Sequence, residues 1–319
     1  MAAVDSFHLL YRDISRSCSS HFEALALIGA LYTASKAVVL LRDCCMVVRV
    51  HFLPRMLPSR GKLTQRYGEW AVIYGASEPV AHAYAEQLAQ NGVSIIFITE
   101  DGSTVRDAVA FLSQTYGVET SVVTASFSLG QAPIKPLLEA LSGKDIGFLV
   151  NCVEEISASP KSLLEIPEQG VLDQVNRNVT AATLVARLVL PGMVERGRGA
   201  VVNISSGTCC RPLPGRVPLT AFAGYLDHFS RALRFEYSNK GIFVQSLIPF
   251  RDQSSSSREG LFAPSPGIYA RHAISTLGVS NRTTGYWPHT LQVSNMFLSE
   301  FLFLMFEWIW ILASRMFLI

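Results

Sequence analysis

Six short apolar runs alternate with helix-type segments between residues 68 and 250, and this alternation constrains the fold more than any other feature. Most of the runs are continuously apolar, which is typical of parallel strands covered on both faces. The expected strands are Trp70–Tyr74, Ser94–Thr99, Ser121–Ala125, Ile146–Asn151, Ala200–Ser205 and Phe243–Pro249. The expected helices are Pro79–Asn91, Val105–Tyr116, Pro133–Leu141, Val171–Glu195 and Leu219–Asn239; beyond them, Pro264–Leu277 fits a helix and Trp287–Val293 fits a strand. The pattern predicts an α/β fold, a Rossmann-like doubly wound parallel sheet, in which ligands bind at the carboxyl ends of the strands.

Apolar segments lie on both sides of this core. Phe22–Leu41 has about the length that spans a bilayer, although two charged residues interrupt it. Met296–Ile319 is strongly apolar and aromatic, and the mean hydropathy of +0.29 also favours membrane contact. These segments could span the bilayer, lie on it or pack on the core. We therefore expect apolar helical extensions at both ends, with a membrane-associating region over residues 1–67, a core domain over 68–294 and an apolar helix over 295–319.

Charge and cysteine content argue against several classes of protein. Only 16% of the residues are charged, the net charge is +2, and no basic stripe contains interleaved aromatic residues, so nucleic acid is not an expected partner. The cysteines are Cys18, Cys44, Cys45, Cys152, Cys209 and Cys210. Their spacing contains no CxxC motif and matches no zinc site. We expect no metal, and thiols that stay reduced.

The end of the fifth apolar run has the frame of a catalytic centre. Gly199–Leu226 begins as a buried strand, reaches Ser205-Ser206, and continues through a Pro-rich turn into a helix. In the short-chain dehydrogenase/reductase superfamily, a serine here is followed thirteen residues later by a tyrosine, and four residues after that by a lysine. In this chain those two positions hold Leu219 and Ala223. Neither side chain can transfer a proton, and loss of a general acid–base typically lowers a rate by about 10²–10⁴.

Residues 68–250 resemble this superfamily, and the string LPGMVERGRGAVVNISSG at Leu190–Gly207 resembles its 17-beta-hydroxysteroid dehydrogenase type 3 branch. The resemblance implies that Ser206 would hydrogen-bond a substrate oxygen and that Asn178 would hold a water relay. It also implies that the missing tyrosine and lysine are the family's proton-transfer pair. Ser206 and Asn178 are therefore residual catalytic candidates, or hydrogen-bonding residues of a strand end and a helix.

The cofactor-binding positions that the resemblance implies are mostly altered. Gly75 and Asn151 keep the family's residues. Glu100, after the second strand, would accept hydrogen bonds from an adenosine ribose and favour NAD over NADP. Five positions depart from the family: Pro79 and Ala81 replace glycines, Ser126 an aspartate, Glu154 a glycine, and Phe250 a glycine. Because Pro79 lacks an N–H and Glu154 adds a charged side chain, we expect no bound cofactor, with NAD or NADP as the alternative.

These residues predict a pseudoenzyme that acts as a membrane-associated scaffold or binding protein. Two alternatives stay open: a weak NAD(P)-dependent oxidoreductase on a hydrophobic steroid or fatty-acyl alcohol or ketone, and a non-catalytic lipid or sterol binder. Three segments resemble a narrower group within this branch, and this resemblance implies that oxidoreductase activity is absent and that the location is mitochondrial. The segments are Met1–Cys18, Tyr225–Leu233 and Gly241–Phe250. Membrane-bound reductases of the same branch imply the endoplasmic reticulum membrane instead. The expected partners are an unidentified protein, a membrane and, by family analogy, a second copy of this chain.

Overall fold

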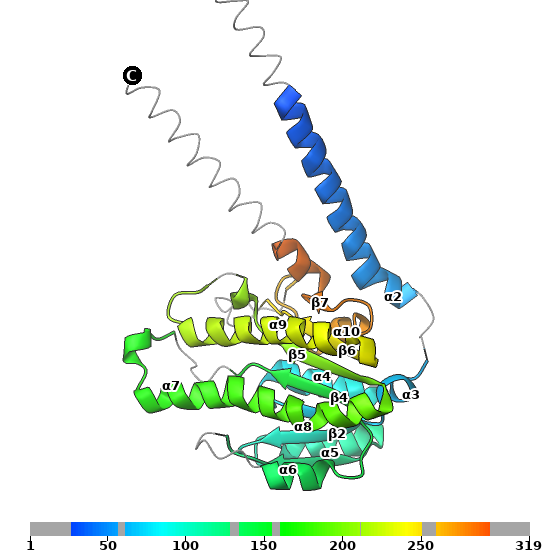
Figure 1. Ribbon diagram of the computed structural model, residues 1–319, viewed down its shortest axis with the longest axis vertical. Helices are drawn as coiled ribbons and strands as arrows, with labels where there is room; N and C mark the ends of the chain where they lie inside the picture. The colour runs from blue at the N-terminus through cyan, green and yellow to red at the C-terminus, as the bar shows by residue number, and fades with distance from the viewer. Residues whose placement is uncertain are drawn as a thin grey trace, which may run out of the picture. The chain divides into compact units, whose positions relative to one another are not determined.

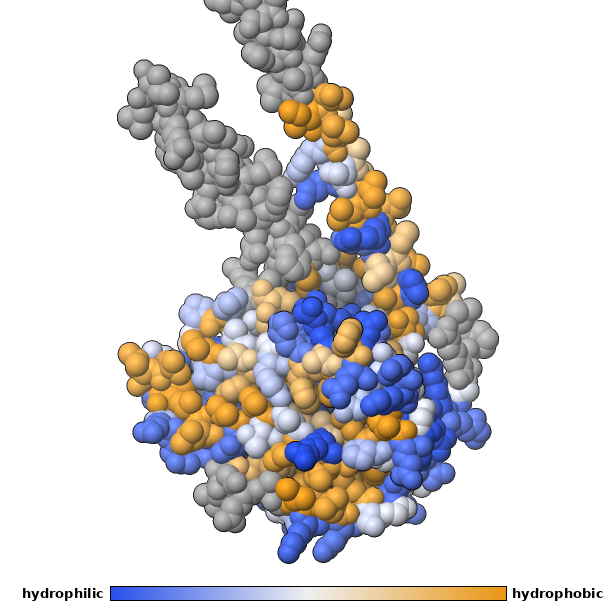
Figure 2. All heavy atoms as spheres, in the orientation of Figure 1, coloured by the Kyte–Doolittle hydropathy of each residue, from blue (hydrophilic) through white to orange (hydrophobic). Residues whose placement is uncertain are grey.

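The computed structural model describes residues 27–56, 61–127, 134–154, 160–210, 212–250 and 260–293. The chain divides into two compact units, Met1–Arg49 and Val50–Ile319. The described part of the first unit is a helix that ends at residue 47 and exposes large apolar side chains (Figure 2), namely Leu27, Ile28, Leu31, Val38, Val39, Leu40, Leu41 and Met46. Among the described residues, no helix combines the length and apolar character needed to cross a membrane. Met296–Ile319 lies outside the described residues, and the expected domain boundaries stay predictions.

The second unit contains a seven-stranded parallel sheet with the order β3-β2-β1-β4-β5-β6-β7, which confirms the predicted fold (Figure 1). The strands are β1 Trp70–Tyr74, β2 Ser94–Thr99, β3 Thr120–Thr124, β4 Ile146–Cys152, β5 Gly199–Ile204, β6 Ile242–Leu247 and β7 Arg282–Thr283. The six strands expected before residue 250 agree with β1–β6 to within two residues at each end. After β3 the chain returns past β2 and β1 and continues with β4 on the other side of β1. The order in which strands are added to the sheet therefore changes direction between β1 and β4.

The strand expected at Trp287–Val293 is wrong, because these residues form a helix and the seventh strand lies earlier, at Arg282–Thr283. Pro288 explains the difference. Its ring fixes φ near the helical value, and it has no N–H to donate to a neighbouring strand. Proline therefore suits the first turn of a helix and disfavours a strand within a sheet.

Helices cover both faces of the sheet (Figure 1). One face packs against α4 (Pro79–Gln90), α5 (Arg106–Tyr116) and α10 (Pro266–Ser275), and the other against α6 (Ile134–Leu141), α8 (Ala181–Arg196) and α9 (Val217–Tyr237). Shorter elements complete the described part of this unit: η1 Val48–Phe52, which crosses its lower boundary, α2 Leu53–Met56, α3 Leu63–Tyr67, η2 Leu163–Glu165, α7 Glu168–Val175, η3 Asn176–Thr180, η4 Gly207–Cys209 and η5 Ser238–Lys240. Alternate residues of β1 point to opposite faces, which is why its sequence is apolar throughout.

The long helix expected at Val171–Glu195 is interrupted. It runs as α7, then as a π-helical turn, η3, and then as α8. Asn178 sits within the turn, where its side-chain amide donates to the carbonyl oxygen of Gln174 at 3.2 Å. A side chain that bonds the backbone one turn earlier competes with the regular helical ladder, so the local widening follows from Asn178.

Candidate functional site

The carboxyl edge of the sheet gathers most of the predicted site residues. Gly75, Glu100, Ser126, Glu154, Ser206 and Phe250 each follow a strand by one to three residues. Pro79 and Ala81 begin α4, Asn178 lies in η3, and Leu219 and Ala223 lie in the first two turns of α9. Since the carboxyl ends of parallel strands lie along one edge, the fold brings these positions to the region where the family's chemistry takes place.

The two proton-transfer positions are both buried, and Leu219 is part of a small apolar cluster. Ala223 is completely buried, and Leu219 is 9% exposed. Leu219 packs in a cluster with Val153, Ala182, Phe222 and Leu226, beside the partly buried Val175, Val179 and Tyr225. No side chain of this cluster carries a charge, and its one hydroxyl is that of Tyr225. The cluster can stabilise the packing of α9 against η3 and α8, but it cannot shuttle a proton to a carbonyl.

Tyr225 is the nearest tyrosine in sequence to Leu219, and its hydroxyl is bonded to another helix. Six residues beyond Leu219 correspond to about 240° around an α-helix, so the two side chains leave α9 in different directions. The Tyr225 hydroxyl lies 2.5 Å from the Thr183 hydroxyl on α8. Thr183 Oγ1 also donates to the Val179 carbonyl oxygen at 2.6 Å. Tyr225 therefore connects two helices and does not substitute for the missing acid.

Ser206 acts as a cap in this structure. Its side chain accepts a hydrogen bond from the Thr208 backbone N–H at 3.4 Å, which begins the 3₁₀ turn η4. The Phe250 ring packs against Gly207, since a Cβ added at Gly207 would lie 2.6 Å from Phe250 Cδ1. The family's glycine at position 250 is thus replaced by an aromatic ring that fills the space beside the residue after Ser206.

Asn178 is 2% exposed and bonded on both sides of its amide. Its Oδ1 accepts from the Glu154 N–H at 2.8 Å, and its Nδ2 donates to the Glu154 carbonyl oxygen at 3.2 Å. Together with the bond to Gln174, these contacts fasten the π turn to the segment that follows β4. Asn178 therefore has a complete structural role without a water relay.

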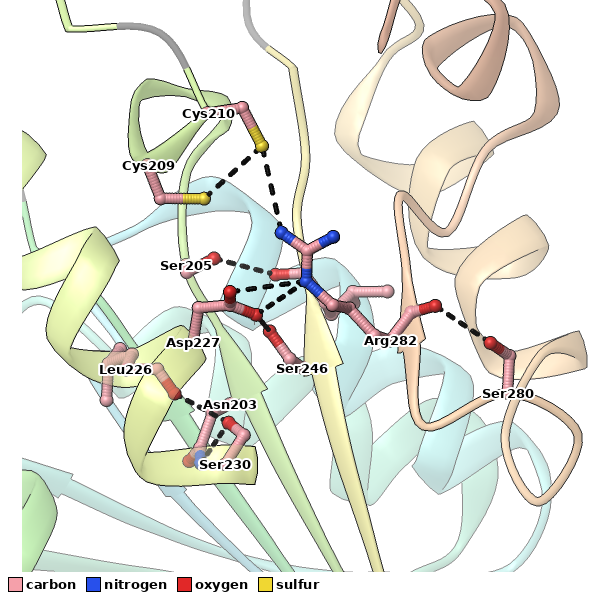
Figure 3. A network of polar contacts seen from close by, with 11 residues as sticks. Asn203, Ser205, Cys209, Cys210, Leu226, Asp227, Ser230, Ser246, Ser280 and Arg282 are labelled. Atoms are coloured by element: carbon pink, nitrogen blue, oxygen red, sulfur yellow. Dashed lines mark hydrogen bonds and ion pairs between the residues drawn. The ribbon is translucent and has the colours of Figure 1, made fainter. Parts of the chain in front are cut away.

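Asn151 is also part of a buried structural network. It is fully buried on β4, and its Nδ2 donates to Asn203 Oδ1 on β5 at 2.9 Å. Asn203 donates in turn to the Ser230 hydroxyl on α9 at 2.8 Å, and Ser230 donates to the Leu226 carbonyl oxygen at 2.6 Å (Figure 3). The chain of bonds joins two strands to the helix above them. Buried amides need such partners; the Asn151 Nδ2 has one, whereas its Oδ1 is buried and has no partner among the described residues, so the network accounts for one side of the amide.

The turn after β1 keeps one glycine for a packing reason. Gly75 has φ +81°, and a Cβ there would collide with the carbonyl oxygen of Cys152 on β4. Pro79 is the first residue of α4, with Glu78 as the N-cap, and Ala81 is fully buried in the first turn of the same helix. Glycine is thus needed where β1 and β4 approach, and the positions that would admit a pyrophosphate carry a proline ring and a methyl group.

Glu154 reaches into this turn. Its Oε1 accepts a hydrogen bond from the Ser77 hydroxyl at 2.8 Å. Burial raises the pKa of the Glu154 carboxyl above its ordinary value, and the negative charges of Glu78 and Glu100 raise it further, against the Ser77 bond and the charge of Arg177. Several carboxylates therefore act on one another at a helix N-terminus, where the family's enzymes hold phosphate groups.

Glu100 is bound within the protein. Its Oε2 forms an ion pair with Arg177 Nη2 at 2.5 Å, and its Oε1 accepts from the Ser126 hydroxyl at 3.2 Å. The Tyr74 hydroxyl donates to the Arg177 carbonyl oxygen at 2.8 Å, which holds the backbone of η3 over β1. These contacts connect the ends of β1, β2 and β3 to η3. The carboxylate expected to bind a ribose is thus engaged with a guanidinium.

Arg177 and Ser77 are site residues that the sequence did not reveal. Arg177 lies 77 positions after Glu100, and Ser77 lies 77 positions before Glu154. Each bond joins segments that meet only when the sheet is complete. The one local signal was that Arg177 directly precedes Asn178. Among the described residues, no group of three or more His, Cys, Asp or Glu side chains could hold a metal ion.

Glu154→Gln is expected to stabilise the protein at neutral pH. The folded pKa of Glu154 is raised, so the ionised carboxylate lowers the free energy of unfolding once the pH exceeds the unfolded pKa of about 4.3. Glutamine keeps an acceptor for Ser77 and does not ionise. The gain in melting temperature should therefore grow from about pH 4 to about pH 7, as thermal unfolding at both values would measure. Glu195→Gln, at an exposed position of α8, is the control. A gain that does not change with pH would contradict the account.

Three comparisons relate the chain to known proteins. The profile of the family described as short chain dehydrogenase matches residues 69–253. The chain is 49% identical over 322 residues to a Danio rerio protein named inactive hydroxysteroid dehydrogenase-like protein 1, covering 99% of both chains. It is 37% identical to the very-long-chain 3-oxoacyl-CoA reductase of Rattus norvegicus, covering 72% of this chain and 75% of the reductase. A solved structure from a study of 7beta-hydroxysteroid dehydrogenase stereoselectivity superposes with a TM-score of 0.65 at 24% identity, covering 74% of this chain and 94% of that one.

Proposed function

The chain belongs to the short-chain dehydrogenase family, and we propose that it is a non-catalytic member whose former active-site edge now serves to hold the fold together. The observation that carries the proposal is that apolar residues fill the two proton-transfer positions. Leu219 and Ala223 are both buried. An enzyme of this family needs a titratable group there, and a packed core cannot supply one. The relatives named as inactive support the same function.

The contacts along the edge also argue against a bound nicotinamide dinucleotide. Such a cofactor carries a negatively charged pyrophosphate, which needs free N–H groups and a close approach at a helix N-terminus. Here Pro79 offers no N–H, and Glu154 places a carboxylate against the turn through Ser77. Glu100, the acceptor for a ribose, is paired with Arg177. The residues present do not fit NAD or NADP, and no step of chemistry is assigned to either.

We propose that the protein works as a membrane-associated scaffold or binding protein. The helix that ends at residue 47 exposes apolar side chains over most of its described length, and these are the groups that an interfacial helix buries in a bilayer or against a protein. A protein partner, a membrane surface and a second copy of this chain remain the proposed partners. The proposed location is the mitochondrion, with the endoplasmic reticulum membrane as the alternative.

Two other functions each have one observation in their favour. The reductase identity of 37% favours a weak oxidoreductase that acts on a hydrophobic alcohol or ketone. Apolar replacements at Leu219, Ala223 and Phe250 favour a protein that holds a sterol or a fatty-acyl chain without reaction.

A turnover and ligand screen separates these functions. Full-length protein is incubated with NADH or NADPH and either a ketosteroid or a long-chain 3-oxoacyl thioester, and nucleotide oxidation is followed by absorbance. We expect no oxidation above the protein-free blank. Thermal unfolding is then measured with cholesterol and with a long-chain acyl-CoA. A rise in melting temperature without turnover would favour the lipid binder, and turnover would overturn the proposal.

A further inference from the structure

A pair of adjacent cysteines lies beside the edge described above. Cys209 is the last residue of η4, and Cys210 is its C-cap, the first residue after the turn. Both thiols are partly exposed. The turn begins directly after Ser206, but neither sulfur takes part in the contacts of the vacated proton-transfer positions. The proposed function does not involve these thiols.

The two sulfur atoms already face each other. Cys209 Sγ lies 3.7 Å from Cys210 Sγ, and Arg282 Nη2 lies 3.9 Å from Cys210 Sγ (Figure 3). Successive residues of a 3₁₀ helix point about 120° apart, so the two sulfur atoms meet through their side-chain conformations and not because the turn aligns them. The arrangement places one sulfur between a second thiol and a guanidinium.

Arg282 is fixed in this position by the fold. Its Nε donates to Asp227 Oδ1 at 3.0 Å and to Oδ2 at 3.2 Å. The Ser246 hydroxyl on β6 also donates to Asp227 Oδ1, at 2.6 Å. Burial raises the pKa of Asp227, but the hydrogen bonds of Arg282 and Ser246 and the charge of Arg282 together outweigh it and lower the pKa, which favours the ionised carboxylate that holds Arg282. Arg282 lies on β7, and its bonds to Asp227 therefore hold its guanidinium beside Cys210.

The two thiols are electrostatically different. The S–H of Cys209 donates to Cys210, and this bond together with the charge of Arg282 lowers the pKa of Cys210 to about 6, against the effects of burial and of Asp227. The same interaction raises the pKa of Cys209, which burial raises further. The two shifts favour the thiolate form on Cys210 and the protonated form on Cys209, whose sulfur atoms lie 3.7 Å apart.

We propose that Cys209–Cys210 is an oxidisable vicinal dithiol, in which Cys210 attacks a hydroperoxide and Cys209 resolves the product. In the first step the Cys210 thiolate attacks one peroxide oxygen. A new S–O bond forms, the O–O bond breaks, and hydroxide or alkoxide leaves and takes up a proton from water. In the second step Cys209, on losing its proton, attacks the sulfenic sulfur. An S–S bond forms and the hydroxyl leaves as water. The two thiols lose two electrons in total, and the hydroperoxide accepts them.

The resulting disulfide is strained, which makes it reversible. Adjacent Cα atoms are about 3.8 Å apart across a trans peptide, whereas disulfides usually join Cα atoms about 4.4–6.8 Å apart. Strained, exposed disulfides have more oxidising potentials and are the labile ones. A dithiol reductant should therefore restore the pair, so the site can cycle between two states.

The other cysteines provide internal controls. Cys44 and Cys45 form a second adjacent pair, but they lie on an α-helix, where successive side chains diverge. Cys152 is buried, and its Sγ lies 3.7 Å from the Val153 carbonyl oxygen. Neither environment supplies the facing sulfur and the anchored guanidinium of Cys210.

The test treats full-length reduced protein with substoichiometric hydrogen peroxide and maps cysteine peptides by mass spectrometry. The expected product is a peptide containing Cys209 and Cys210 that has lost two hydrogen atoms and regains them with dithiothreitol, while the Cys44–Cys45 peptide is unchanged. In Cys209→Ser, the serine hydroxyl still donates to Cys210, and a sulfenic acid on Cys210 should accumulate and be captured by dimedone. Oxidation of both pairs to the same extent, or a sulfenic acid on Cys210 that persists in the wild type, would overturn the proposal.

A second readout keeps the test independent of disulfide geometry. Alkylation by iodoacetamide at about pH 6 should be about tenfold faster at Cys210 than at Cys44 or Cys45, because the larger thiolate fraction outweighs the lower nucleophilicity of a less basic thiolate. Arg282→Met should slow the Cys210 reaction at this pH by about threefold per unit of raised pKa, and Arg282→Lys should restore part of the rate. Equal rates at Cys210 and Cys44 would contradict the assigned role of Arg282.

Discussion

Replacement of Ala223 by lysine, the family's residue at this position, is expected to lower the free energy of unfolding by about 3–5 kcal/mol. Ala223 is completely buried on α9. An ammonium group placed there loses its hydration. The carboxylate one turn later on α9, Asp227, is already bonded to Arg282 and Ser246, so the new charge is poorly compensated and strongly destabilising. Urea unfolding followed by circular dichroism would measure the loss.

Ala223→Met is the matched control, since methionine has a similar length and no charge. Overpacking alone should cost about 1–3 kcal/mol, and the remaining loss in Ala223→Lys is due to the charge. Burial depresses a lysine pKa, so the difference between the two variants should shrink as the pH rises towards the unfolded lysine pKa of about 10.4. Equal stability of the two variants at neutral pH would show that the position is hydrated, contrary to this account.

The same substitution tests the loss of catalysis. The double variant Leu219→Tyr with Ala223→Lys restores both proton-transfer groups, but Pro79 and Glu154 still occupy the turn at the start of α4. We therefore expect no reduction of a ketosteroid or a 3-oxoacyl thioester by the folded fraction of this variant. Turnover by the double variant would show that only the acid and the lysine were missing, and that the edge still accepts a cofactor.

Gly75→Ala is expected to be the second large loss, about 3–4 kcal/mol. Gly75 combines a positive φ of +81° with a backbone contact, because a Cβ would meet the Cys152 carbonyl oxygen. Neither β1 nor β4 can move without breaking the register that pairs Tyr74 with Asn151. The loss would be measured by urea unfolding, which needs no enzymatic activity.

Gly117→Ala separates the two contributions in Gly75→Ala. Gly117 has φ +65° at the end of α5, but nothing lies within 4 Å of an added Cβ. It therefore reports the cost of the left-handed backbone alone, about 1 kcal/mol. If Gly75→Ala were no more destabilising than Gly117→Ala, the glycine would not be explained by packing against β4, and its retention for a ligand would become the better explanation.

The sequence predicted the strands well and the connections less well. Continuous apolar runs define β1 to β6 because helices cover both faces of the sheet, and strands buried on both faces need apolar side chains at successive positions. The strand prediction for Trp287–Val293 was wrong because a short segment of mixed polarity has little periodicity. Pro288 favours the helix that forms there. The π turn at Asn176–Thr180 depends on bonds between Asn178 and a segment 24 residues earlier, which no local pattern contains.

The candidate site shows the same division. The absence of the tyrosine and the lysine, at Leu219 and Ala223, could be predicted from spacing alone, because α9 fixes the place of both residues relative to the strand end. The partners of Glu100 and Glu154 did not, because Arg177 and Ser77 meet them only across the assembled sheet. Retained residues were the least informative: Asn151 and Gly75 match the family, yet a buried bond accounts for one side of the Asn151 amide and a backbone contact for Gly75.

The loss of cofactor binding is tested most directly by titrating the full-length protein with NADH and with NADPH in an isothermal titration calorimeter. We expect no saturable binding of either nucleotide, because the ion pair of Arg177 with Glu100 and the contact of Glu154 with Ser77 occupy the edge that a dinucleotide requires. Stoichiometric binding of either nucleotide with a dissociation constant in the micromolar range would contradict this expectation.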